Sequence, residues 1–164
     1  MPYKTFDQNK WAARFIDMAK LVASWSKDPS TKAGAVIADG NRVISTGYNG
    51  FPVFCDDSEE IYFDKDRKYK RVVHAELNAI LFAKGRSECC NMYCTNIPCS
   101  QCTAAIIQSG IKCVVVPEQD SSFMDRWMSS IRESIEMMED AGVKCIIFKD
   151  NGFITIGDYI KIYK

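Results

Sequence analysis

The chain has a single histidine, His74, which lies two residues before Glu76. Any site that uses a histidine must therefore be built around His74, and mechanisms that need two histidines, such as the H-E-x-x-H zinc proteases, are excluded. A second segment rich in potential ligands is residues 98–102, which reads P-C-S-Q-C. A site that uses both segments requires a fold that brings them together, and this requirement constrains the chain more than its composition does.

The side chains of His74, Cys99 and Cys102 can supply three protein ligands to a zinc ion. Three protein ligands leave a fourth position for water, which is the arrangement of catalytic rather than closed structural zinc sites. The chain pattern places both segments at the starts of helices, where unpaired backbone N–H groups favour thiolate over thiol. Pro98 suits such a boundary, because its missing N–H costs little in the first turn of a helix. We therefore predict one catalytic zinc site.

Glu76 stands in the first turn of its expected helix, where its carboxylate can point toward the open zinc position without being a ligand. Zinc lowers the pKa of water from 15.7 toward ~7, so hydroxide exists at neutral pH. Removal of an exocyclic amine also needs a proton on the ring nitrogen and then on the departing amine, and one carboxylate can make both transfers. The combined pattern H-x-E…P-C-x-x-C is the signature of zinc-dependent nucleobase deaminases. We therefore predict that Glu76 is the catalytic proton shuttle.

Other interpretations of these residues are open on the sequence alone. His74 and Glu76 could be surface residues, and the C-x-x-C could be a redox pair, although the expected opening helix and hairpin do not supply a thioredoxin-like context. A structural zinc knot could recruit one of three further cysteines, Cys89, Cys90 or Cys94. A fourth cysteine ligand would distinguish such a knot from an open catalytic site.

Eight cysteines are many for 164 residues. Because residues 1–10 lack the apolar stretch of a secretory signal, we interpret the cysteines as metal ligands or core residues rather than disulfides. The formal net charge of zero argues against a polynucleotide substrate. No apolar run approaches the ~18–20 residues of a membrane span. We expect one deaminase domain over residues 1–164, with no membrane or polynucleotide partner, in the cytoplasm (the host cytoplasm if the source is viral).

Apolar periodicity predicts alternating helices and strands. Helical spacing covers residues 7–26, 73–84, 99–109 and 122–140. Short apolar runs that predict strands cover residues 33–38, 42–46, 91–95, 112–116, 144–148 and 153–156. Residues 47–52 are expected to form a loop, residues 56–71 give the least regular pattern, and Asn151-Gly152 has the composition of a hairpin turn. The basic residues at 65–71 are interpreted as a solvated loop. This order favours one mixed sheet between helices.

The site segments and their neighbours resemble the cytidine and deoxycytidylate deaminase superfamily, and within it the dCMP deaminase family. The blocks that carry the resemblance are residues 32–37, 45–52, 74–80 and 92–116, of which the G-Y-N-G-x-P motif favours the dCMP branch. The resemblance implies an α/β fold, a three-layer α/β/α sandwich with a mixed five-stranded sheet. It also implies zinc on residues 74, 99 and 102, with residue 76 as proton shuttle.

For the reaction, the resemblance implies zinc-dependent hydrolysis of dCMP to dUMP and ammonia, which supplies the precursor of dTMP. The alternative is a deaminase of another cytosine or adenine substrate, such as cytidine, dCTP or tRNA adenosine; a non-enzymatic zinc module is a third interpretation. The family is homo-oligomeric, commonly hexameric. Its members are known to be activated by dCTP with Mg²⁺ and inhibited by dTTP, so these nucleotides are expected effectors.

Substrate contacts are expected from four residues. The resemblance implies that Asn49 hydrogen-bonds the sugar, although an asparagine before glycine is also an ordinary turn residue. We expect Ala75 to contact the substrate, and Phe82 either to contact the base or to pack in the core. A phosphate needs a cation, for which Lys32 is one candidate.

The sequence departs from the family pattern in three places. Some phage members have a functional arginine shortly after the H-A-E helix, where this chain has Gly85 between Lys84 and Arg86, two further candidates for the phosphate contact. Members often have tyrosines after the fourth strand, whereas residues 116–120 here contain none and the first aromatic residue is Phe123. Some phage members bind a second zinc through extra histidines, which this chain lacks. The departures leave nucleotide regulation and the base-stacking partner open.

Overall fold

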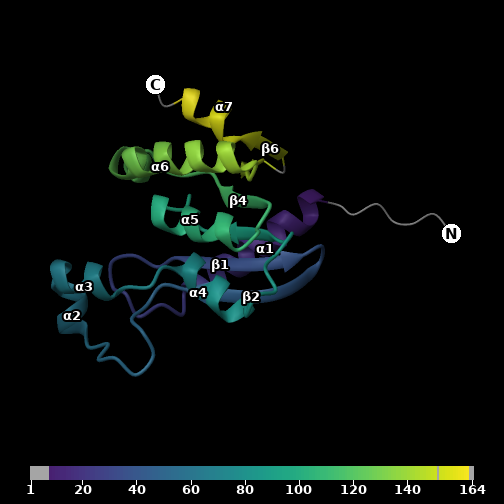
Figure 1. Cartoon of the computed structure of the whole chain (residues 1–164). Coiled ribbons are helices and arrows are strands. Elements are labelled where there is room, and N and C mark those ends of the chain that lie inside the picture. The colour runs from purple at the N-terminus through teal and green to yellow at the C-terminus, as the bar shows by residue number, and fades with distance from the viewer. Residues whose placement is uncertain (1–7, 151, 163–164) are drawn as a thin grey trace.

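The computed structural model describes residues 8–150 and 152–162 (Figure 1). Its helices are α1 (Gln8–Ala23), α2 (Glu59–Phe63), α3 (Lys65–Arg71), α4 (Ala75–Ala83), α5 (Ser100–Gln108), α6 (Ser121–Ala141) and α7 (Ile156–Lys161). Its strands are β1 (Gly34–Asp39), β2 (Arg42–Tyr48), β3 (Asn91–Cys94), β4 (Cys113–Pro117), β5 (Lys144–Lys149) and β6 (Gly152–Thr155). No described helix combines the length and apolar composition needed to cross a membrane.

The strands form one mixed sheet in the order β2-β1-β3-β4-β5-β6. β1 pairs antiparallel with β2 in the expected hairpin and antiparallel with β3 on its other side. β3, β4 and β5 run parallel, because α5 and α6 return the chain to the same end of the sheet between them. β6 closes the edge antiparallel to β5.

The family resemblance implied five strands, and this prediction was wrong: the sheet has six. The additional strand is β6, which the apolar pattern at 153–156 did predict. Its residues alternate between half-buried and exposed, and Phe153 pairs across the ladder with Phe148, their ring centroids 5.4 Å apart. Such cross-strand aromatic pairs stabilise an edge strand. Asn151, of the expected hairpin turn, lies outside the described residues.

Helices cover both faces of the sheet (Figure 1). α1 packs on one face with Phe15 in its core, while α4, α5 and α6 lie on the other. Along β1, Ala35 and Ile37 join the core under α4–α6, whereas Val36 and Ala38 join the core under α1. This alternation is the period of two of a strand that is buried on both faces. The predicted three-layer α/β/α sandwich is confirmed.

Residues 56–71, the least regular part of the sequence, contain two short helices that extend to one side of the sheet (Figure 1). α3 begins where the Asp64 side chain accepts a hydrogen bond from the backbone N–H of Arg67. α7 was not predicted either, and it begins in the same way, with Thr155 accepting from the N–H of Asp158. Helices of seven and six residues are too short to show apolar periodicity.

β2 continues through Gly47 and Tyr48, which were predicted to be loop. A Cβ atom at Gly47 would lie 2.3 Å from the carbonyl oxygen of Ala75 and 2.4 Å from the nitrogen of Ala79. Only glycine therefore lets the backbone of α4 lie directly on β2. This contact fixes the start of α4, where the residues of the first site segment lie.

Candidate zinc and substrate site

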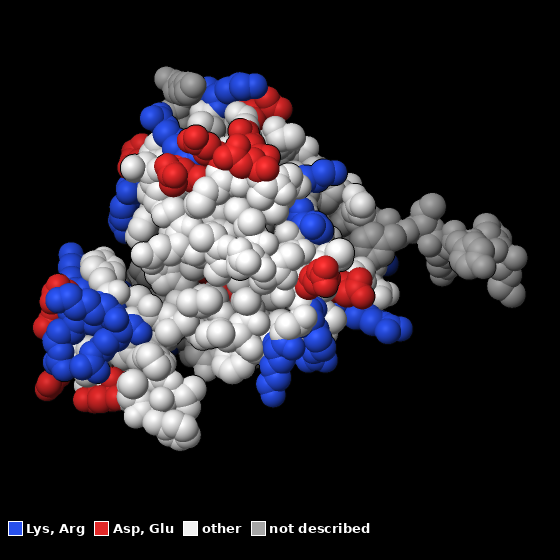
Figure 2. Space-filling model, viewed as in Figure 1, with Lys and Arg blue, Asp and Glu red and all other residues white. Residues whose placement is uncertain are grey.

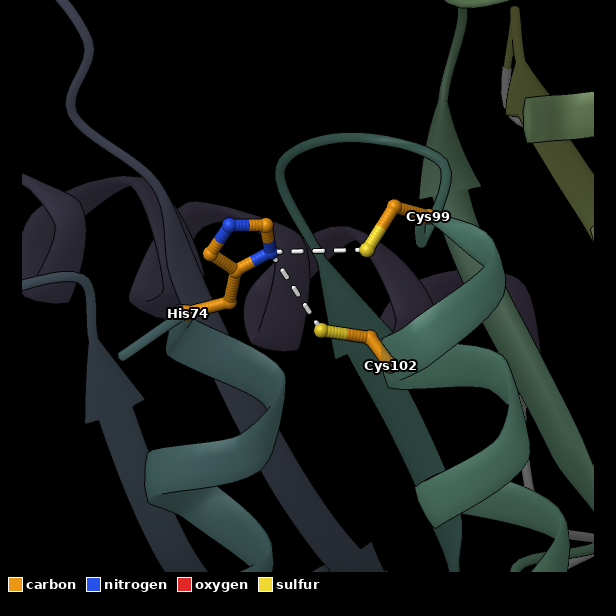
Figure 3. Close-up of side chains that lie close together, drawn as sticks. All are labelled: His74, Cys99 and Cys102. Carbon is orange, nitrogen blue, oxygen red and sulfur yellow. Dashed lines mark hydrogen bonds between the residues drawn. The ribbon is translucent and has the colours of Figure 1, made fainter. Parts of the chain in front are cut away.

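His74 and Cys99 are the N-cap residues of α4 and α5, and Cys102 lies in the first turn of α5. Neither N-cap side chain makes a capping hydrogen bond, and all three side chains meet between the helices (Figure 3). The Nδ1 atom of His74 lies 3.5 Å from Cys99 Sγ and 3.4 Å from Cys102 Sγ. In the described part of the chain, this is the one group of three or more potential metal ligands.

The spacing of these atoms suits zinc. With Zn–N of about 2.0 Å and Zn–S of about 2.3 Å, nitrogen and sulfur ligands on a tetrahedral ion lie about 3.5 Å apart. The two Nδ1–Sγ distances match this value. No fourth cysteine from the described residues joins the group, which argues against a structural zinc knot. The donor set is that of an open zinc site.

Hydrogen bonding and burial shift the pKa values of the three groups. Cys102 and His74 hydrogen-bond to the sulfur of Cys99 and lower the pKa of that thiol, although burial opposes the shift. The pKa of Cys102 is raised, because its thiol bonds to Cys99 and is buried. The hydrogen bond with Cys99 also raises the pKa of His74. Metal binding needs all three groups deprotonated, so it would release protons here.

Glu76 lies in the first turn of α4 and is buried, with 7% of its surface exposed. Burial raises the pKa of its carboxyl group, because desolvation disfavours the charged form. A hydrogen bond with Cys102 acts in the opposite direction. A raised pKa makes the carboxylate a stronger base, which suits a group that accepts a proton from water.

His74, Cys99 and Glu76 line a cavity of about 750 Å³. This volume lies within the range of roughly 300–1,000 Å³ for small-molecule sites. The cavity opens beyond the carboxyl end of β3, as expected for ligand sites in sheets with parallel strands. The other walls come from the loop after α1, from Asn49, from α3 and from the first half of α6.

Two of the predicted substrate contacts, Asn49 and Ala75, line this cavity. The Oδ1 atom of Asn49 accepts a hydrogen bond from the N–H of Ala33 at 2.8 Å. Its Nδ2 atom donates to the carbonyl oxygen of Thr31 at 2.8 Å. Asn49 is thus a buried residue that holds the cavity wall, and its contact with a sugar stays a prediction.

The other predicted contacts lie away from the cavity lining. Lys32 is exposed, and its ammonium group donates to the carbonyl oxygen of Ser26. Phe82 is 56% exposed near the C-terminal end of α4, whereas the site lies at the N-terminal end. Lys84 and Arg86 follow that same C-terminal end. A helix of nine residues is about 13 Å long, so the structure does not bring these side chains to the site.

The sequence did not identify α3 and α6 as cavity walls. The residues that these helices contribute are Lys65, Lys68, Tyr69, Phe123, Arg126, Trp127, Ser130 and Ile131. Phe123 and Trp127 lie in the segment 122–140 that was predicted to be helical, and their ring centroids lie 6.4 Å apart. The Lys and Arg residues of α3 form a basic cluster beside a largely uncharged face over α5, and acidic side chains lie above that face over α6 (Figure 2). No sequence pattern placed this cluster beside the zinc site.

Together, the fold and the site define a class of protein, the zinc-dependent hydrolytic deaminases. Residues 9–118 match the family model for the cytidine and deoxycytidylate deaminase zinc-binding region. The chain belongs to this family, as the resemblance predicted.

Individual relatives agree with this assignment. The chain is 49% identical over 136 residues to an uncharacterised deaminase of the luxG 3′ region of Aliivibrio fischeri, covering 83% of this chain and 92% of the relative. It is 39% identical over 119 residues to human deoxycytidylate deaminase, covering 68% of this chain and 67% of the relative. The dCMP deaminase of cyanophage S-TIM5, solved with dCMP and dUMP, superposes with a TM-score of 0.69 at 23% identity, covering 84% of this chain and 96% of the phage chain. That structural likeness supports the fold.

Proposed function

We propose that this chain hydrolyses dCMP to dUMP and ammonia. The observation that carries the proposal is that the His74–Cys99–Cys102 group and the buried Glu76 lie at one cavity of nucleotide size. The human relative is named deoxycytidylate deaminase, and the cyanophage structure holds dCMP and dUMP, which supports cytosine deoxynucleotide as substrate.

In the proposed mechanism, zinc held by His74, Cys99 and Cys102 would supply Lewis-acid activation of water at neutral pH. The Glu76 carboxylate accepts the proton of the attacking water and passes it to N3 of the cytosine ring. As the C4–N4 bond breaks, Glu76 carries the second water proton to the departing amine, which leaves as ammonia. The oxygen of water stays on C4, and Glu76 returns to its starting protonation state.

The cavity walls suggest how the substrate is oriented. The side-chain N–H donors of Asn49 are engaged by Thr31 and Asp28, whereas among the described residues its Oδ1 accepts one hydrogen bond, from Ala33. We propose that the second lone pair of Oδ1 accepts a hydrogen bond from a hydroxyl group of the sugar. The rings of Phe123 and Trp127 lie in the cavity wall and offer an aromatic surface for the base.

The phosphate of dCMP needs positive charge at the cavity. Of the residues that the structure describes, three with cationic side chains line it: Lys65 and Lys68 from α3 and Arg126 from α6. Lys68 already forms an ion pair with Asp28. We propose that Lys65 and Arg126 contact the phosphate through charge-assisted hydrogen bonds.

A substrate panel tests the proposed function. Rates on dCMP, deoxycytidine, cytidine, dCTP and an RNA stem-loop would be compared for the zinc-loaded protein and for Glu76→Gln. We expect dCMP to have the highest kcat/KM and Glu76→Gln to abolish most of that activity. Comparable kcat/KM for dCMP and deoxycytidine would instead support a cytidine-type deaminase.

We further propose, from the family resemblance, that residues 1–164 act as one deaminase domain in the cytoplasm. By the same resemblance, we expect the chain to assemble into a homo-oligomer, a hexamer. By the same resemblance, dCTP with Mg²⁺ is proposed to activate the enzyme and dTTP to inhibit it. Light scattering gives the assembly mass, and dCMP turnover with each nucleotide gives its regulation. A monomer that neither nucleotide affects would contradict both proposals.

A further inference from the structure

In the described part of the chain, three acidic or basic side chains are buried: Asp28, Lys68 and Glu76. All three line the cavity. The proposed reaction gives a role to Glu76 but none to Asp28 or Lys68. Burial of an ion pair costs desolvation free energy that the attraction between the charges barely offsets, so stability alone gives little reason for it.

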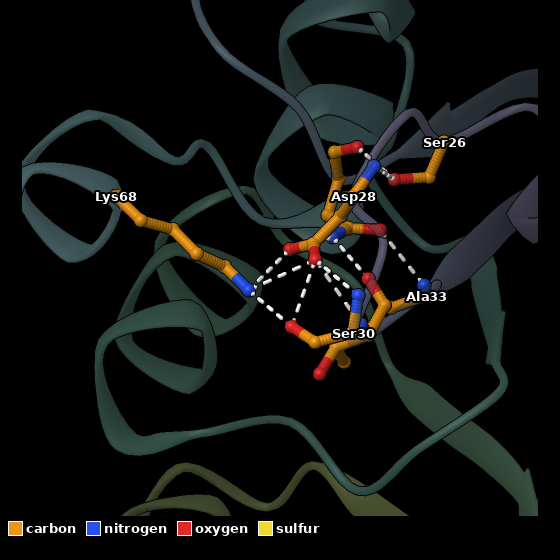
Figure 4. A network of polar contacts seen from close by, with 7 residues as sticks. Ser26, Asp28, Ser30, Ala33 and Lys68 are labelled. Carbon is orange, nitrogen blue, oxygen red and sulfur yellow. Dashed lines mark hydrogen bonds and ion pairs between the residues drawn. The ribbon is translucent and has the colours of Figure 1, made fainter. Parts of the chain in front are cut away.

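The ammonium group of Lys68 is fully engaged (Figure 4). Its Nζ atom lies 2.7 Å from Oδ2 and 2.9 Å from Oδ1 of Asp28, and 2.7 Å from Oγ of Ser30. An ammonium group has three N–H donors, and these three acceptors account for them. Lys68 is therefore placed to hold the cavity wall rather than to bind a substrate anion.

The carboxylate of Asp28 also hydrogen-bonds to the backbone of the loop after α1. Its Oδ1 atom accepts hydrogen bonds from the backbone N–H of Ser30 at 2.9 Å and of Thr31 at 3.1 Å. The carbonyl oxygen of Thr31 in turn accepts from Nδ2 of Asn49, and the next contact is the N–H of Ala33 with Oδ1 of Asn49. The residue that faces the proposed sugar site is thus held by the ion pair through one intervening loop.

A backbone bridge connects the segment after α3 to the residue that follows Asn49. Between α3 and His74, Val73 exchanges two backbone hydrogen bonds with Gly50, at 2.8 and 3.1 Å. Gly50 directly follows Asn49, so the sugar-side residue and the first zinc-side residue are adjacent across this bridge. A change in the position of α3 would therefore act on the substrate wall of the cavity.

We propose that Lys68 is a positioning residue for the reaction: through its ion pair with Asp28 it holds the loop 28–33 and Asn49 in the conformation that accepts the nucleotide. This role rests on the proposed function. Lys68 acts on substrate binding through Asp28 and Asn49, and it leaves the metal group and Glu76 unchanged.

The test is Lys68→Met, which keeps an unbranched side chain of similar length but removes the charge. We expect KM for dCMP to rise by about tenfold or more and kcat to stay within about threefold, because substrate binding rather than chemistry is affected. Zinc content should equal that of the parent protein. Lys68→Arg should have a KM between those of Lys68→Met and the parent protein, because a guanidinium group can still pair with Asp28. Lys70→Met is the matched control, since Lys70 lies on the same helix with its side chain 71% exposed.

A second readout needs no substrate. Amide hydrogen exchange at Thr31 and Ala33, measured by NMR in ligand-free protein, should be faster in Lys68→Met than in Lys70→Met. If the parent protein proves inactive on dCMP, the proposed function fails, and this exchange measurement still decides the positioning role. Unchanged KM and unchanged exchange would overturn it, as would a loss of zinc that accounts for the lost activity.

Lys68→Met leaves the Asp28 carboxylate buried without its partner, which can prevent folding. The double variant Lys68→Met with Asp28→Asn removes both charges and avoids this cost. It should fold and still show the raised KM, because the ion pair is absent. A double variant with the KM of the parent would overturn the proposal.

Discussion

His74 and Cys99 are both N-cap residues, neither side chain caps its own helix, and the two side chains meet between the helices with Nδ1 and Sγ 3.5 Å apart. The first turns of two helices therefore converge on one point. The dipoles of the two helices stabilise negative charge there, which favours the thiolates that zinc needs. The position of the metal group therefore depends on how the two helices are arranged. Loss of one ligand should lower the zinc content of the protein.

The first prediction concerns the metal. We expect about one zinc per chain, since three ligands form one open tetrahedral site. Cys99→Ser and Cys102→Ser should each lose most of the zinc, measured by metal analysis of dialysed protein. Cys89→Ser is the control, because Cys89 is exposed and outside the ligand group. Equal zinc loss in Cys89→Ser would favour a structural knot instead.

The second prediction concerns proton transfer. Glu76→Gln keeps the shape of a buried side chain but cannot accept the proton of water. The variant should retain zinc and the folded state, while kcat on dCMP falls by ~10²–10⁴, the contribution of a lost general acid–base group. Zinc analysis and single-turnover rates measure the two effects separately. Turnover near that of the parent protein would end the proposed role of Glu76.

The metal group could be predicted from the sequence because its chemistry requires rare residue types in a fixed order. One histidine and one P-C-x-x-C leave few choices. The α6 wall could not be predicted, because Phe123 and Trp127 share the i, i+4 spacing of a buried helix face and periodicity does not separate a core from a cavity. The pairing of Lys68 with Asp28 joins residues 40 apart in the sequence, and no local pattern connects them.

The strands and long helices could be predicted because their apolar periods, two and about 3.6, are sustained over enough residues. The packing of the start of α4 on β2 could not be predicted from these periods. The close contact of Gly47 with Ala75 is a tertiary feature, and a glycine before a turn motif is equally typical of a loop. The short helices α2, α3 and α7 depend on local caps and on packing, which periodicity does not report.

The third prediction concerns the phosphate. Each charge-assisted hydrogen bond contributes ~1.5–3 kcal/mol, and ~1.4 kcal/mol corresponds to a factor of ten. Lys65→Met and Arg126→Met should therefore each lower kcat/KM for dCMP by about tenfold or more and leave the rate on deoxycytidine nearly unchanged. Lys32→Met is the comparison, because Lys32 bonds to a backbone carbonyl away from the cavity lining. A larger effect at Lys32 than at Lys65 and Arg126 would move the phosphate contact to Lys32.

The fourth prediction concerns stability and pH. Burial tends to raise the pKa of Asp28, but hydrogen bonds from Lys68, Ser30 and Thr31 outweigh it and hold the pKa below its usual range. A carboxylate whose pKa is lower in the folded state stabilises the protein above its unfolded pKa, about 3.9, and this contribution is lost as pH falls through the folded value.

Urea unfolding over a series from about pH 6 to about pH 2 measures this contribution, because the loss lies below the unfolded pKa of about 3.9. The free energy of unfolding should fall more steeply with acid in the parent protein than in Asp28→Asn, which has no carboxyl group to protonate at this position. Asp17→Asn is the control, since Asp17 is exposed on α1. Parallel pH profiles for the parent and Asp28→Asn would show that the ion pair does not contribute to acid sensitivity.

The fifth prediction concerns the contact that positions α4. In Gly47→Ala, the new methyl group would meet the backbone of Ala75 and Ala79 at 2.3 and 2.4 Å, so α4 must move away from β2. Overpacking of this kind costs about 1–3 kcal/mol of unfolding free energy. Because His74 and Glu76 flank Ala75, the displacement should also lower kcat and zinc affinity together. Gly157→Ala is the matched control, since no atom lies within 4 Å of the new methyl group. Normal zinc affinity and kcat in a destabilised Gly47→Ala protein would show that α4 can shift on the sheet without disturbing the site.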